Sequence, residues 1–190
     1  MKKSTLSLWI GCLFTLILSS ARAQNECGGV YLTSSDYLAG KAYPAKTLRG
    51  KSWSNGEDLL GSKRLLVDLS GQLHETEMAA IYAVKCCNGN IVRIFQGGTY
   101  MLLNPGGSIP MYKVTIGSSG KGDYTIVKYF FSKDAAADIQ ELTVDNLRDA
   151  FADNKKFDDA LIQFRSDRDL ASYDKKQKCF RLDKVYSETH

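Results

Sequence analysis

A change of hydrophobic period within the chain constrains the fold more than any other feature of the sequence. Between Arg64 and Ser132 apolar residues either alternate with polar ones or form short β-branched and aromatic runs, which is typical of strands. After Asp134 the apolar residues take the spacing of short amphipathic helices. The chain is therefore predicted to be an α+β protein with its strands and helices in separate segments.

Three runs within residues 64–132 carry the clearest strand pattern. They are Leu65–Leu69 and Met111–Ile116, which alternate and predict half-buried strands, and Tyr124–Phe131, whose almost uninterrupted apolar character predicts burial on both faces. Asn88-Gly89 is a strong hairpin signal, and the glycine-rich "GSSGKG" over residues 117–122 predicts a looser turn. We expect an antiparallel sheet of about five strands.

Residues 24–63 predict an N-terminal element followed by a loop. A short extended run leads into a helix that starts at Ser34–Asp36 and stops at Gly40. Residues 46–63 are rich in Gly, Ser, Asn and Lys, which favours an exposed loop or a weak strand.

The C-terminal segment, residues 133–190, predicts three short helices. Thr143, Asn154 and Ser166 can each cap one of them. Because so small a segment cannot bury enough surface alone, we expect the helices to cover the sheet within a single domain. The tail from Cys179 to Tyr186 is compatible with a last strand or with a helix.

The N-terminus has the pattern of a secretory signal peptide. Lys2 and Lys3 precede an apolar run, Leu6–Leu18, and a small-residue site ends at Ala23. The run is shorter than the roughly 20 residues of a spanning helix. A lipoprotein would use Cys12, but that cysteine lies inside the apolar run. We expect cleavage after Ala23 and a mature chain, residues 24–190, in the periplasm or outside the cell.

Most of the net positive charge belongs to this export signal. The whole chain has a formal charge of +4, and removing residues 1–23, which hold three basic residues and no acid, leaves +1. Nucleic-acid binding is not expected of a chain without a basic excess. No later apolar run has membrane length, so we expect no transmembrane segment in the mature chain.

Two stretches resemble a group of secreted bacterial proteins with no assigned activity. They are "GVYLTSSDYLAGK" near the N-terminus and "LTVDNLRDAFADNKKFDDALIQFRSDRDLASYDKKQKCFRLDKVY" near the C-terminus. The resemblance implies an export-competent domain and transfers no catalytic residue. The adjacent cysteines are not part of it.

Four cysteines remain after signal removal: Cys27, Cys86, Cys87 and Cys179. An even number in an oxidising compartment favours disulfides. Adjacent Cα atoms lie about 3.8 Å apart, below the roughly 4.4–6.8 Å that a disulfide spans. Cys27 is therefore expected to pair with Cys86 or Cys87, and Cys179 with the other. Strand alternation places Cys86 toward the core and Cys87 outward, so one disulfide plus one buried thiol is also compatible with the sequence.

No stretch carries a catalytic signature. Cys87 and His74 are weak candidates for a nucleophile and its base, but "HETEM" is not the H-E-x-x-H zinc motif because its fifth residue is Met78. The C-terminal acids interleave with lysines and arginines, which is typical of solvated helix surfaces. We expect neither a metal nor a cofactor.

Binding is the functional class with the most support. Trp53, Tyr100 and Tyr112 lie near predicted loops or strand edges, where exposed aromatic side chains serve as anchors. The sequence favours a non-enzymatic exported bacterial protein that binds a glycan or an envelope protein. The alternatives are a small exported hydrolase or thiol enzyme using Cys87 and His74, and a structural protein that docks a partner through its C-terminal helices.

Overall fold

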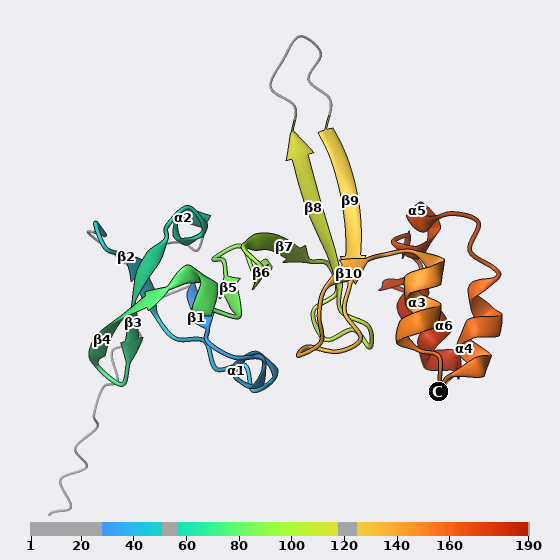
Figure 1. The fold of residues 1–190 in the computed structure, drawn as a ribbon, viewed down its shortest axis with the longest axis horizontal. Helices are drawn as coiled ribbons and strands as arrows, with labels where there is room; N and C mark the ends of the chain where they lie inside the picture. The colour runs from blue at the N-terminus through green and yellow to red at the C-terminus, as the bar shows by residue number, and fades with distance from the viewer. Residues whose placement is uncertain (1–27, 51–56, 118–124, 190) are drawn as a thin grey trace, which may run out of the picture.

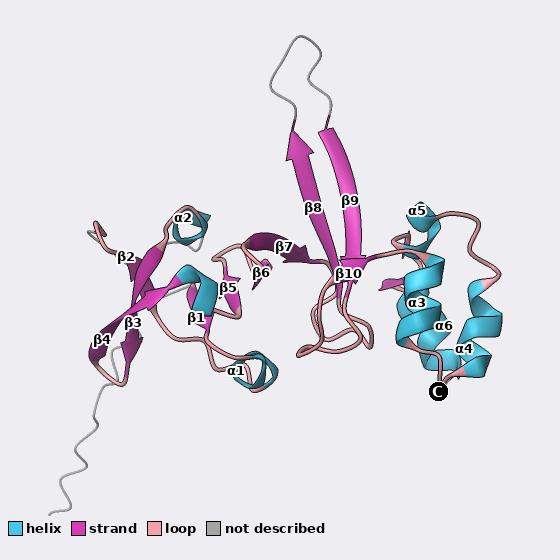
Figure 2. Cartoon of the chain, in the orientation of Figure 1, coloured by secondary structure: helices cyan, strands magenta, loops and turns pink. Residues whose placement is uncertain are grey.

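The structure is a computed structural model that describes residues 28–50, 57–117 and 125–189. These residues form three antiparallel sheets and several short helices, with most of the helical residues gathered at one end of the long axis (Figures 1 and 2). The predicted α+β class is confirmed. None of the helices described has the length and apolar character needed to cross a membrane.

The largest sheet has seven strands where about five were predicted. In spatial order they are β1 (Gly29–Tyr31), β5 (Ala83–Lys85), β6 (Ile91–Phe95), β7 (Gly98–Leu102), β8 (Met111–Gly117), β9 (Thr125–Phe131) and β10 (Gln140–Glu141). The extra strands are very short. Two or three residues cannot show an alternation, so β1 and β10 carry no periodic signal of their own.

The first of the predicted strands lies in a second sheet and not in the main one. It consists of β2 (Ala45–Thr47), β3 (Arg64–Leu69) and β4 (Gln72–Glu77). Ser70 and Gly71 both have positive φ in the tight turn between β3 and β4. β4 is almost entirely exposed and lacks an apolar face, so its sequence has no hydrophobic alternation that would predict a strand.

The Asn88-Gly89 hairpin joins β5 to β6 as predicted, with a different register. A two-residue Asn88-Gly89 loop would pair Cys86 with Ile91, whereas the structure pairs Lys85 with Ile91. Gly89 has a φ of 86° and its N–H donates to the Cys86 carbonyl at 3.0 Å. The loop is therefore one residue longer, a type I turn closed by a left-handed glycine.

The N-terminal helix α1 (Ser34–Leu38) begins where the sequence predicted. Thr33 caps it: its Oγ1 accepts from the Asp36 N–H, and the Asp36 carboxylate accepts in return from the Thr33 N–H, both at 3.0 Å. Gly40, at a φ of 66°, follows the helix end. A short helix, α2 (Glu57–Leu60), and a 3₁₀ turn, Met78–Ala80, lie before β5. Helices are thus not confined to the C-terminus.

The three predicted C-terminal helices are present. They are α3 (Val144–Ala150), α4 (Lys155–Leu161) and α5 (Asp167–Leu170). Thr143 and Asn154 cap the first two through their side-chain oxygens, while Ser166 makes no such bond at α5. The ambiguous tail is both strand and helix: a hairpin of β11 (Tyr173–Asp174) and β12 (Cys179–Phe180) leads directly into α6 (Arg181–Thr189).

The helices do not cover the main sheet evenly, because the buried side chains form two separate clusters. The N-terminal core lies between β1, β5 and β6 and the three-stranded sheet, and includes Val30, Leu65 and Val84. The C-terminal core joins the helices to the base of β8 and β9 through Met111 and Phe131. The middle of the seven-stranded sheet therefore connects two packed regions.

One loop of the C-terminal core requires a residue without a side chain. A Cβ on Gly107 would lie 2.8 Å from the Asp183 Oδ2 and still closer to the Asn104 amide nitrogen. The Asn104 Nδ2 donates to Asp183 at 2.7 Å, which ties the β7–β8 loop to α6.

Gly107→Ala is expected to lower the free energy of unfolding by about 1–3 kcal/mol, because the added methyl must push Asn104 away from Asp183. The control is Gly61→Ala, where a Cβ meets nothing within 4 Å. Urea unfolding of both variants measures the difference. Equal stabilities would show that the loop can move aside.

Candidate interaction surface

The structure does not assemble the predicted thiol site. His74 lies on β4 of the three-stranded sheet, whereas Cys87 lies in the β5–β6 turn of the seven-stranded one. Cys87 is disulfide-bonded. While that bond is intact the residue has no thiolate to act as a nucleophile.

The cysteines follow only part of the predicted pairing. Cys86 is buried as predicted, and neither Cys86 nor Cys179 is disulfide-bonded. No disulfide joins two cysteines within the described ranges, so the partner of Cys87 lies outside them. The predicted disulfide of Cys179 with Cys86 or Cys87 is wrong, because Cys86 packs in the N-terminal core and Cys179 lies beside the C-terminal helices.

The predicted aromatic binding residues differ in how accessible the structure leaves them. Trp53, like the predicted signal peptide, Cys12 and Cys27, lies outside the described residues. Tyr112 is only 2% exposed and cannot anchor a ligand. Tyr100, on β7, is half-buried and packs edge-to-face on Phe130 with ring centroids 5.1 Å apart. Tyr100 is thus the one of these aromatic residues that the described surface leaves partly accessible.

Tyr112 is buried because it belongs to a polar network around Arg93. Arg93, on β6, is 5% exposed, and its Nη1 donates to the Tyr112 hydroxyl at 3.1 Å and to the Ser132 Oγ at 3.2 Å. Its Nη2 donates to the Ala137 carbonyl at 2.8 Å. Ser132 Oγ donates to the Asp134 carbonyl, so the Tyr112 hydroxyl donates its own proton to Ser132.

The Arg93 charge is balanced by dipoles and rings. No carboxylate of the described residues pairs with it, but the guanidinium carbon lies 5.0–5.8 Å from the ring centroids of Tyr82, Phe95 and Tyr112. The Tyr82 hydroxyl donates to the Ala135 carbonyl at 2.7 Å, and burial raises the pKa of Tyr82, while Arg93 opposes that rise. Arg93 and Tyr82 together hold the segment after β9 against the sheet.

Beyond this fixed base, β8 and β9 continue as a two-stranded ribbon. β7 pairs with β8 only as far as Lys113, and β10 pairs with β9 only at Phe130 and Phe131. We call residues 114–117 and 125–128 the arm; it projects away from both cores in Figure 1. Within the described residues no strand pairs with either outer edge of the arm, so both edges present backbone groups.

The arm exposes apolar side chains that the sequence predicted to be buried. Ile116 and Ile126 face each other across the ribbon and are 48% and 45% exposed, and Val127 on the other face is 42% exposed. The prediction of a β9 buried on both faces is therefore wrong for its first half. These residues are apolar, but no layer of the described structure covers them.

The exposed residues form a stripe that reaches the sheet. Strand alternation puts Val114 and Ile116 on the same face as Tyr112, and the register adds Ile126 and Phe130, with Lys128 between them. Tyr100 extends this face through its contact with Phe130. We call Tyr100, Val114, Ile116, Ile126 and Phe130 the apolar stripe.

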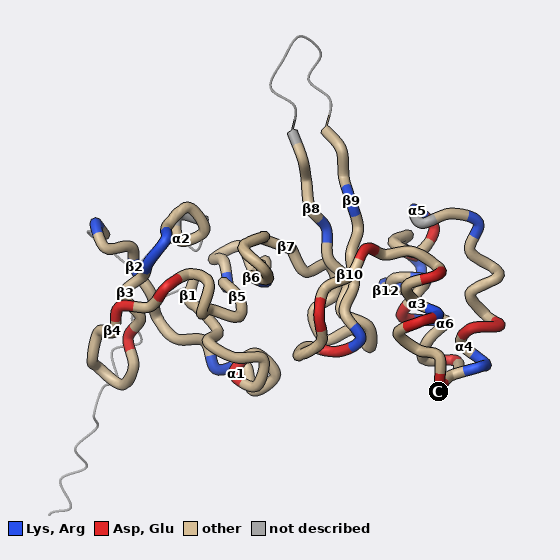
Figure 3. The backbone as a smooth tube through the Cα atoms, in the orientation of Figure 1, with Lys and Arg blue, Asp and Glu red and all other residues tan. Residues whose placement is uncertain are grey.

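The described part of the arm carries a single charged residue. That residue is Lys128; Lys113 lies just below the arm, where β8 still pairs with β7, and Figure 3 shows blue but no red along β8 and β9. Lys128 makes a long ion pair of 3.8 Å with Glu141 on the neighbouring edge. The arm thus combines an apolar face, open backbone edges and positive charge.

Sequence analysis missed Arg93 and the exposure of the arm. An arginine inside the apolar run Ile91–Phe95 was a usable signal, because a charge in a buried strand needs a dedicated set of partners. Exposure of the arm had no such signal, since burial of β9 depends on what lies beside it.

Comparison of the chain with known proteins finds no relative. No protein-family model, curated protein or solved structure matches this chain. Across the residues that the structure describes, no group of three or more His, Cys, Asp or Glu side chains could hold a metal ion.

Arg93→Ala is expected to lower the free energy of unfolding by about 3 kcal/mol, because it opens a cavity and leaves the Ala137 carbonyl without its donor. Arg64→Ala is the matched control: Arg64 also lies on a strand, but its pair with Glu75 is exposed and worth less than about 1 kcal/mol. Chemical unfolding compares them, and a small loss for Arg93→Ala would contradict its structural role.

Proposed function

We propose that the protein is an exported bacterial, non-enzymatic interaction domain that binds an extended segment of another envelope or extracellular protein along the arm. The observation that carries the proposal is the exposure of Ile116 and Ile126 on a ribbon with two unpaired edges. Contiguous exposed apolar surface on such an element marks an interaction site.

Backbone geometry favours a partner in the extended conformation. A strand that adds to an open edge satisfies the edge N–H and C=O groups, while alternate side chains enter neighbouring pockets. A two-stranded ribbon is only marginally stable alone in water, and a third strand adds the missing support. Val114 and Ile116, on the β8 edge, would contact every second residue of the added segment.

Charge selects among extended segments. Lys128 lies on the same face as the apolar stripe, opposite Val114, and Lys113 lies on the other face at the foot of the arm, so a segment that alternates apolar with acidic residues is complementary in both respects. A glycan is the weaker choice of the two kinds of partner, because Tyr112 is buried and cannot offer its ring to a sugar.

Export is the second part of the proposal and rests on the signal pattern of residues 1–23 and on the resemblance to secreted bacterial proteins. A disulfide at Cys87 is consistent with an oxidising compartment. If the chain is cleaved after Ala23, Cys27 is the remaining cysteine available to pair with Cys87, because Cys86 and Cys179 are not disulfide-bonded.

A photo-crosslinking amino acid at Ile116, introduced in the native host, is expected to give one discrete heavier adduct, because the stripe is the contact surface. Gel mobility and mass spectrometry identify the adduct. Leu38 on α1, 73% exposed, is the matched control position and should give none.

Two results would overturn the proposal: equal adducts from both positions, or an adduct of Ile116 with twice the mass of the chain. The first would mean nonspecific contact, and the second would mean that a second copy occupies the arm. Adding Ile126→Ser to the Ile116 probe should remove the adduct without unfolding the domain, because Ile126 is half exposed.

Intact mass tests export and the disulfide together. The natively produced protein is expected to begin at Gln24 and, denatured without reduction, to take up two alkyl groups; after reduction it should take up four. No uptake without reduction would indicate two disulfides, and four would indicate none, and both would contradict the proposed single bond. A lipid-modified chain beginning at Cys12 would contradict cleavage after Ala23.

A further inference from the structure

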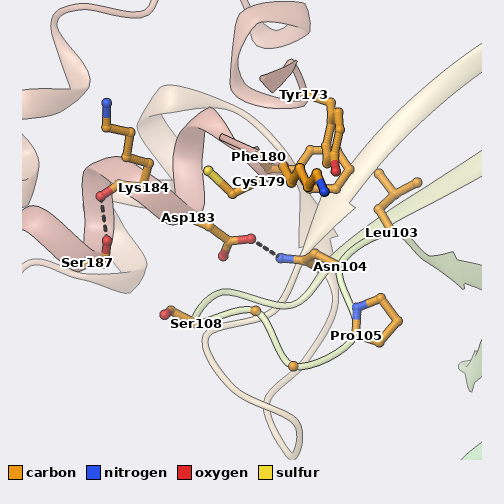
Figure 4. A pocket seen from close by; sticks show the side chains of 13 residues that line it. Leu103, Asn104, Pro105, Ser108, Tyr173, Cys179, Phe180, Asp183, Lys184 and Ser187 are labelled. Carbon is orange, nitrogen blue, oxygen red and sulfur yellow. Dashed lines mark hydrogen bonds between the residues drawn. The ribbon is translucent and has the colours of Figure 1, made fainter. Parts of the chain in front are cut away.

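A cavity of about 540 Å³ lies in the C-terminal region, away from the arm. The β7–β8 loop forms one wall, and the β11–β12 hairpin with the start of α6 forms the other (Figure 4). This volume is in the range of small-molecule sites. Its lining combines one carboxylate, two lysines and an aromatic pair.

The carboxylate is Asp183, half-buried in the first turn of α6. It accepts from the Asn104 Nδ2 at 2.7 Å and, less closely, from the Ile109 N–H at 3.3 Å. Burial raises the pKa of Asp183, and the hydrogen bonds from neutral donors oppose that rise. No lysine or arginine of the described residues forms an ion pair with Asp183, so its negative charge lacks a cationic partner.

The lysines, Lys178 and Lys184, line the same cavity. Lys184 pairs with Glu188 at 3.7 Å one turn further along α6. Lys178 lies exposed in the β11–β12 turn at a φ of 54° and forms no ion pair within the part of the chain described. The cavity therefore holds one carboxylate and one ammonium that do not neutralise each other.

The aromatic pair forms an apolar wall. Tyr173 packs edge-to-face on Phe180 with centroids 5.1 Å apart, yet Tyr173 remains 50% exposed. Leu103 and Pro105 belong to the facing loop (Figure 4). An apolar group between these walls would be shielded from water on two sides.

From these three features we propose that the cavity binds a free amino acid with an apolar side chain. The ligand ammonium donates to Asp183, the ligand carboxylate accepts from Lys178, and the apolar side chain packs on Tyr173 and Phe180. Opposite charges at fixed positions select a molecule carrying both, since each unpaired charge would disfavour a ligand that lacks its counterpart. This site is independent of the proposed partner surface on the arm.

Titration of the full chain with L-phenylalanine, followed by NMR amide shifts, tests the proposal. The amides of residues 104, 106–108 and 178–184 are expected to shift and saturate. N-acetylphenylalanine lacks the ammonium and phenylalaninamide lacks the carboxylate, so each should bind at least tenfold more weakly. Equal binding of either analogue, equal shifts with glucose, or no shift with phenylalanine would overturn the proposal.

Lys178→Gln separates ligand recognition from folding, because Lys178 is exposed and holds no other described group. It should weaken phenylalanine at least fivefold and leave phenylalaninamide unchanged. Lys176→Gln, in the same turn but outside the cavity lining, is the control. Asp183→Asn should weaken phenylalanine and phenylalaninamide alike. A loss for phenylalaninamide in Lys178→Gln would show that the variant damages the site rather than removing a carboxylate contact.

Discussion

The rest of the structure depends on the buried guanidinium of Arg93. It lies on the strand between the two hydrophobic cores and donates to Tyr112, Ser132 and Ala137, which lie on β8, just after β9 and further along the same segment. A planar group with several donors can bind three acceptors in different directions, which a lysine ammonium cannot do with the same geometry. The Nε is buried without a hydrogen-bond partner among the described residues, so the contacts of the two Nη groups and the rings around them hold β8 and β9 in a fixed position between the cores.

That fixed base explains how the arm can expose apolar residues. The same two strands alternate their side chains between the Arg93 network and the helices: Tyr112 points to one, and Met111 and Phe131 pack into the other. Both faces are therefore anchored at the base, and the register continues outward to Ile116 and Ile126 without further support. Lys128, on the open edge of β9, limits nonspecific pairing there, a common feature of exposed strands.

Local signals made much of the fold predictable, whereas layer contacts did not. Helix starts at Thr143 and Asn154 and the hairpin at Asn88-Gly89 follow from single side chains and the turn chemistry of glycine. The division into two cores does not, because the pattern of Leu65–Leu69 is the same whether it joins the main sheet or a separate one. Likewise, the sequence predicts burial of Ile126 and Val127, which are exposed in the structure, because composition shows apolar character and not whether another layer covers it.

The surroundings of the candidate site residues were likewise not predictable from local sequence signals. Tyr100 and Tyr112 have equivalent sequence signals, yet Arg93 buries one hydroxyl while the other ring lies at the foot of the stripe. Contacts between residues far apart in the sequence also position the polar groups of the β7–β8 loop. Asn104 donates to Asp183, which lies 79 positions later in the chain, and accepts from the Met111 N–H at 2.8 Å. One amide thus joins the cavity floor on α6 to the first residue of β8. Gly107 is the one local sequence feature that reflects this contact, because only a residue without a Cβ lets the Asn104 and Asp183 side chains meet there.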